Sequence, residues 1–66
     1  MTKQYEVYEN GVLIHGCIYG HSKTFVIKSF LNMEGILYKS AKEIGNNIVV
    51  TLEDGSKKYF TTSIVY

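Results

Sequence analysis

His15 and Cys17 carry the most reactive side chains of this 66-residue chain, because imidazole and thiolate groups bind metals and form nucleophile–base pairs. They are two positions apart in a run of strand-forming residues, so both project from one face of the predicted strand. His21 could join them from the next turn. Without a carboxylate at matching spacing, these residues fall short of the usual zinc sites. We therefore expect no metal site, with Cys17 as a small, partly buried hydrophobic residue.

The spacing of these residues is also poor for nucleophilic catalysis. Side chains two positions apart on a strand are roughly 6–7 Å apart, whereas a histidine activates a cysteine through a direct hydrogen bond. A chain of this length offers little volume for a substrate cleft. We expect a protein that is not an enzyme, with no catalytic residue and no cofactor.

Lysines and tyrosines form the second group of candidate residues. If the predicted strand Ser56–Thr61 lies near the segment Tyr38–Lys42, their lysines form one basic edge with tyrosines between them. Such an edge is typical of platforms for single-stranded nucleic acids. The same lysines could instead protect edge strands from pairing with other sheets. The candidate partner-binding residues are Tyr38, Tyr59, Lys39, Lys57 and Lys58, with Lys42 on the same edge.

Composition favours a protein partner over a nucleic acid. Seven lysines and six acids give a net charge of +1, which provides little overall attraction for nucleic acids or membranes. The chain has no arginine, the side chain that reads guanine and clamps phosphate most effectively. Because each buried tyrosine hydroxyl needs a partner, six tyrosines against three phenylalanines place some rings on an interaction surface.

The length and the single cysteine bound the class of protein. Residues 1–66 make one small domain, and one cysteine excludes an internal disulfide and fits a reducing compartment. No apolar run reaches the ~18 residues of a membrane span, and the start has no signal-peptide pattern. A chain rich in lysine, asparagine, isoleucine and tyrosine is typical of AT-rich genomes, where short bacterial-virus genes are common. We expect a cytoplasmic protein, in the host cytoplasm if it is viral.

Two turns organise the chain. Asn10-Gly11 and Asp54-Gly55 are strong hairpin signals, because type I′ turns need positive φ at both central residues. Between the turns the alternation of apolar and polar residues predicts strands over 4–9, 12–19, 23–31, 36–39, 48–53, 56–61 and 64–66, with a tight turn at Thr62-Ser63. The fold class is therefore all-β: a single small bent antiparallel sheet or a barrel of five to six strands.

Two further features refine this prediction. Gly16 interrupts a strand and indicates a bulge or sharp bend. Residues 40–45 allow at most one helical turn, from the capping-box spacing of Ser40 and Glu43, or the tail of a bent strand. The predicted core is Val7, Ile14, Ile18, Phe25, Ile27, Leu37, Ile48, Val50, Leu52, Phe60 and Ile64.

The second half of the chain has a recognisable order of pieces. A strand over Gly35–Tyr38 is followed by an apolar strand that ends in Asp-Gly over Ile48–Gly55, and then by Tyr59–Val65 with its brief turn and closing strand. Residues 34–66 thereby resemble the small Tudor/KOW-type barrels. The resemblance implies a bent five-stranded barrel and a non-enzymatic binding module, and it transfers no site residue. The hairpin at Asn10-Gly11 departs from the order of that family.

These features predict a non-catalytic protein-binding module, namely a small regulator or inhibitor that docks on a larger protein machine. If the composition reflects an AT-rich viral genome, the protein is of phage origin. The alternative is a nucleic-acid-binding small barrel that uses the lysine and tyrosine edge. A third interpretation is a homodimer that completes its core by strand addition across a sheet edge.

Overall fold

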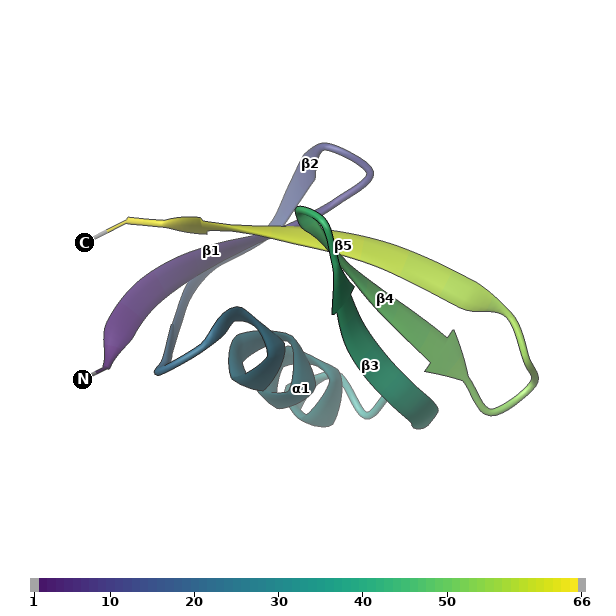
Figure 1. Cartoon of the computed structure of the whole chain (residues 1–66). Coiled ribbons are helices and arrows are strands. Elements are labelled where there is room, and N and C mark those ends of the chain that lie inside the picture. Colours follow the sequence, from purple (N-terminus) through teal and green to yellow (C-terminus); the bar gives the residue numbers. More distant parts are fainter. Residues whose placement is uncertain (1, 66) are drawn as a thin grey trace.

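The computed structural model describes residues 2–65, in which a five-stranded antiparallel sheet carries one helix against one of its faces (Figure 1). The elements in chain order are β1 (Lys3–Glu9), β2 (Val12–Gly20), α1 (Lys23–Met33), β3 (Tyr38–Ile44), β4 (Asn47–Leu52) and β5 (Lys57–Ile64). Across the sheet the order is β2-β1-β5-β4-β3, so β2 and β3 are free edges and the sheet is not closed. The predicted small, mostly β fold is confirmed in its open-sheet form.

Both predicted hairpins are confirmed, and the predicted type I′ geometry is found at Asn10-Gly11, whereas at Asp54-Gly55 only the glycine has a positive φ, so that turn is not type I′. Asn10 and Gly11 have φ values of 52° and 83°, which is the positive pair that a type I′ turn requires. At the other hairpin Gly55 has a φ of 91°, and the Leu52 N–H donates to the Ser56 carbonyl at 2.8 Å. These turns set the registers of β1 with β2 and of β4 with β5.

The predicted strand over residues 23–31 is wrong, because this segment forms α1. The Ser22 hydroxyl accepts a hydrogen bond from the Phe25 N–H at 3.2 Å and caps the first turn. After the helix ends, Gly35 takes a positive φ of 70°, as is usual just beyond a helix C-terminus. The four buried helix residues follow helical spacing, and they are Val26, Ile27, Phe30 and Leu31. Within residues 2–65 no helix is long and apolar enough to cross a membrane.

The structure decides between the two alternatives for residues 40–45, and one smaller prediction is wrong. Residues 40–44 belong to β3 and pair with β4 throughout, which is the strand alternative, because the sheet satisfies more backbone groups than one isolated helical turn would. Thr62 and Ser63 form no turn, since β5 continues to Ile64 and pairs there with β1. Tyr66, the end of the predicted final strand, lies outside the described residues. The bulge predicted at Gly16 is confirmed by a register shift between β1 and β2.

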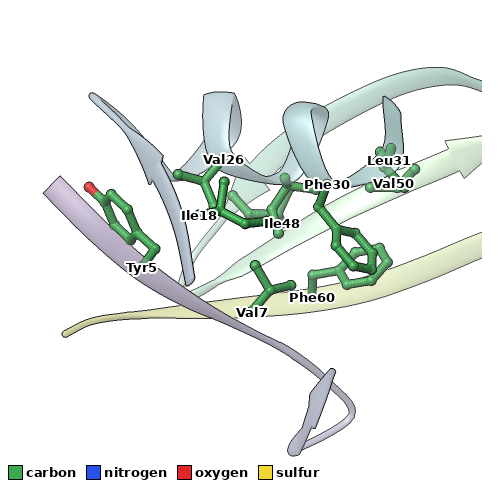
Figure 2. Close-up of a cluster of buried hydrophobic side chains, with 10 residues drawn as sticks. Tyr5, Val7, Ile18, Val26, Phe30, Leu31, Ile48, Val50 and Phe60 are labelled. Atoms are coloured by element: carbon green, nitrogen blue, oxygen red, sulfur yellow. The ribbon is translucent and has the colours of Figure 1, made fainter. Parts of the chain in front are cut away.

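The core lies between α1 and the sheet, and Figure 2 shows its side chains meeting there. Phe30 of α1 meets Phe60 of β5 edge to face, with ring centroids 5.9 Å apart. Six predicted core residues are buried: Val7, Ile18, Ile27, Ile48, Val50 and Phe60. Tyr5 and the helix residues Val26, Phe30 and Leu31 complete the core.

Five predicted core residues are not buried. Phe25 is exposed because α1 turns Val26 inward in its place, and Leu37 is 76% exposed before β3 begins. Ile14 and Ile64 are also exposed, and Leu52 is half-buried at the margin of the core. An alternating pattern predicts that every second residue is buried, whereas α1 buries two neighbouring residues in each turn, Val26 with Ile27 and Phe30 with Leu31.

Gly20 lets α1 start close to β2. A Cβ atom at this position would lie 2.7 Å from Cγ2 of the buried Val26 and 2.8 Å from Cδ2 of Phe25. Only glycine allows that approach without moving the helix.

Candidate functional site

The sheet has two faces of different character. The inner face is covered by α1 and carries the core, whereas the outer face is turned away from the helix (Figure 1). Directly paired residues on antiparallel strands share a face, and successive residues alternate between faces. The registers therefore assign each candidate side chain to one face.

The two candidate tyrosines lie on opposite faces. Tyr38 pairs with Leu52 on the inner face and packs against the core, half-buried. Tyr59 pairs with Val49 on the outer face and is 47% exposed. Of these two rings, Tyr59 is the one offered to a partner.

The candidate lysines are divided in the same way. Lys58 pairs with Val50 on the inner face, where its Nζ lies 3.3 Å from Oε2 of Glu9 in a half-exposed salt bridge. Lys57 pairs with Thr51 and therefore points outward. The predicted edge with all four lysines does not exist, because Lys57 and Lys58 point to opposite faces.

Lys39 and Lys42 join Lys57 on the outer face. Lys42 pairs with Val49, which is an outward residue. Lys39 follows the inward Tyr38 and therefore faces outward, and the register shift between Tyr38 and Ser40 places Ser40 opposite Thr51 on the same outer face. We call these three exposed residues the lysine arc: Lys39, Lys42 and Lys57.

Apolar and aromatic side chains gather on the same face, beside the lysine arc. Leu13 on β2 pairs with Tyr8 on β1, and Tyr8 pairs with Thr61 on β5. Tyr59 lies two residues before Thr61 on the same strand and therefore on the same face. Leu13 is 49% and Ile44 is 59% exposed. We call this group the outer-face cluster: Tyr8, Leu13, Ile44, Val49 and Tyr59.

Tyr8 is held in place within the cluster. Its hydroxyl donates a hydrogen bond to Oε1 of Glu6 at 2.8 Å, on the same face of β1. This hydrogen bond to a carboxylate raises the pKa of Tyr8 above its ordinary value. The Tyr8 hydroxyl thus keeps the proton that it donates to Glu6.

His15, Cys17 and His21 do not come together as a site. His15 contacts Phe30 edge to face at 6.1 Å, and His21 stacks on Phe25 at 4.7 Å. Cys17 is exposed, so its predicted partial burial is wrong: it precedes the inward Ile18 on β2 and therefore points outward. A hydrogen bond with the Cys17 side chain raises the pKa of Tyr19. Among residues 2–65, no three histidine, cysteine or acidic side chains are grouped to hold a metal.

A shallow hollow of about 290 Å³ lies at the start of β1 and is lined by Thr2, Lys3, Gln4 and Tyr19. Its lining brings together the hydroxyl of Thr2, the ammonium group of Lys3, the amide of Gln4 and the phenol of Tyr19.

Comparison of the chain with protein-family models, with curated proteins and with solved structures found no match. The resemblance to Tudor/KOW-type barrels therefore stays a prediction. The candidate surface rests on geometry, and four members of the outer-face cluster were not selected from the sequence: Tyr8, Leu13, Ile44 and Val49. Their outward positions could be recognised only once the pairing partners were known.

Proposed function

We propose that this chain is a non-catalytic protein-binding module whose outer sheet face docks on a larger protein, as a small regulator or inhibitor does. The observation that carries the proposal is the outer-face cluster, in which exposed and half-buried apolar and aromatic side chains share one face of the sheet. Burying apolar surface is favourable by roughly 25 cal/mol per Å² of apolar accessible area. A partner that covers the cluster would gain this free energy on binding.

The arrangement of the cluster supports this proposal. Tyrosine is among the residues enriched at protein interfaces, and energetically dominant contacts lie near the centre of an interface with polar residues around them. Tyr59 lies beside Val49, and the half-buried Thr51 and Thr61 flank these two residues on the same face. Val49 and Tyr59 thus form an apolar pair, and Thr61 lies between this pair and Tyr8 with Leu13.

Binding of single-stranded nucleic acid is the second candidate function. The lysine arc and Tyr59 share the outer face and provide cations beside one stacking ring. The other half of the predicted platform is missing, because Tyr38 lies on the inner face and Lys58 is paired with Glu9. The apolar members of the cluster and the lack of arginine favour a protein partner.

Affinity capture from cells of the native host, followed by mass spectrometry, tests the proposal. The baits are the wild-type chain, Tyr59→Ala, Leu13→Ala and a control, Met33→Ala, which removes a side chain that is 57% exposed on α1. We expect one protein to be captured by wild type and by Met33→Ala, and to be reduced at least about tenfold with the two cluster variants.

Two results would contradict the proposal. One is a protein captured equally by all four baits, provided that thermal melts show each variant to be folded. The other is capture that disappears after nuclease treatment, which would favour the nucleic-acid function.

A further inference from the structure

The outer face is not electrically neutral on the side of β3, β4 and β5. The outward positions of these strands carry the lysine arc and no carboxylate. Glu43 lies opposite Ile48 on the inner face, and Glu53 and Asp54 belong to the turn after β4. The Asp54 carboxylate is occupied by the N–H and hydroxyl of Ser56, at 2.9 and 2.6 Å.

The three lysines of the arc are unpaired and close to one another. Within residues 2–65 the one salt bridge joins Lys58 to Glu9 on the inner face. Lys57 and Lys39 flank Thr51 from the two neighbouring strands, so their Cα atoms are roughly 10 Å apart at the usual strand spacing. Lys42 lies on the next outward row, across Val49 from Tyr59.

We infer that the part of the partner covering this half of the outer face is an acidic protein segment with an apolar side chain among its carboxylates. The inference rests on the proposed function and deepens it, by assigning a chemistry to the partner. Carboxylates would meet the lysine arc, while the apolar side chain would lie on Val49 and Tyr59. Such complementary charges at an interface accelerate association and exclude wrongly charged partners.

A protein segment fits this half of the face better than a nucleic acid. Lysine ammonium groups are point charges that accept carboxylate and phosphate alike. The apolar centre, however, needs an apolar side chain, and the outer face offers one exposed ring next to the arc rather than a row of rings. Glu6 on β1 would also repel a phosphate backbone that continued across the sheet.

The test uses the ¹⁵N-labelled chain and three probes at one low salt concentration. The first is a short synthetic peptide of acidic residues around a phenylalanine. The second is the same peptide with every acid replaced by its amide, and the third is oligothymidylate of equal charge. We expect the acidic peptide to shift the amide signals of residues 39–42, 49–51 and 57–61. The amide peptide should bind at least about tenfold more weakly, and added salt should weaken the acidic peptide.

Matched variants distinguish the effect of the lysine arc on binding from the effect of the net charge of the chain. Lys42→Gln and Lys57→Gln should each weaken the acidic peptide several-fold, whereas Lys28→Gln, at an exposed position of α1, should leave its affinity unchanged. Equal binding of the acidic and amide peptides would overturn the inference, and so would failure of both to bind. Tighter binding of oligothymidylate would replace it with a nucleic-acid ligand. None of these outcomes depends on the capture experiment, which tests the docking face itself.

Discussion

At the scale of residues, neighbours in the sequence have different environments. Lys57 is free on the outer face, while Lys58 is half-exposed on the inner face and paired with Glu9. Tyr59 is offered to solvent, while Phe60 fills the core. A strand that is covered on one face alone produces this alternation, so a variant must be interpreted by its face.

Lys57 and Lys58 make a matched pair of variants. Lys57→Glu should weaken partner binding several-fold, because it places a carboxylate inside the lysine arc. Lys58→Glu should leave binding unchanged and lower the free energy of unfolding by up to about 1 kcal/mol, since it faces Glu9 in a half-exposed pair. Titration of the captured partner and urea melts check the two effects. A loss of binding confined to Lys58→Glu would contradict the assignment of faces.

Cys17 should be chemically reachable but functionally silent. Because its thiol is exposed, it should react with a thiol reagent in the folded chain without unfolding. Cys17→Ala should keep partner binding and change the free energy of unfolding by less than about 0.5 kcal/mol. A folded Cys17→Ala chain that no longer binds would assign Cys17 to the binding surface.

At the scale of elements, the hairpins were predicted from the sequence, whereas the helix was mistaken for a strand. Asn10-Gly11 and Asp54-Gly55 are local signals, whose conformations depend on a few atoms. The segment that forms α1 is rich in β-branched and aromatic residues and alternates well enough to indicate a strand. Its capping serine and the glycine after its end were signals that could have identified it.

The registers explain why the candidate site was only partly predictable. The candidates on β5 lie on both faces, with Lys57 and Tyr59 outward and Lys58 inward, and the face of Tyr38 relative to the rest of β3 depends on the bulge in that strand. That bulge is set by pairing with β4, which the sequence of β3 alone does not reveal.

The edge strand β2 is a poor template for a second copy of the chain. Two register shifts interrupt its pairing with β1, and the Cys17 N–H donates to Nδ1 of His15 at 3.3 Å. Bulged edges resist strand addition. This geometry disfavours a homodimer that forms by strand addition at β2.

The turns yield a stability prediction with an internal control. Gly11→Val and Gly55→Val force a β-branched residue into positive φ, so each should cost roughly 1–3 kcal/mol. At roughly 4–8 °C per kcal/mol, the melting temperature should fall clearly in both variants. Gly16→Ala should melt close to the parent, because its φ is ordinary and a Cβ there meets open space. Equal melting of all three variants would mean that the turns do not have these conformations.

The helix start is tested by its cap. Ser22→Ala removes the hydroxyl that accepts from Phe25 and should lower the free energy of unfolding by about 1 kcal/mol. Ser22→Asp keeps a capping acceptor and should restore most of that loss. Denaturant melts measure both variants. No difference between them would argue against a capped helix at this position.

At the scale of the whole molecule, the two faces of the sheet differ in what they contribute. The core is formed by α1, which lies beneath the sheet (Figure 1), and by the inner face of the sheet. Within the described residues, the outer face contributes no side chain to this core. Its apolar members are half-buried or exposed, and their replacement should affect binding more than stability. A small chain thereby combines a stable core with a broad contact surface.

The most direct test of the docking face is an amide-shift map of the ¹⁵N-labelled chain with its captured partner. We predict that signals of the outer-face cluster and of its strand neighbours move or broaden, while those of Lys28 and Met33 on α1 stay in place. A map confined to α1 would contradict the account, because the outer face would then not be the surface that binds.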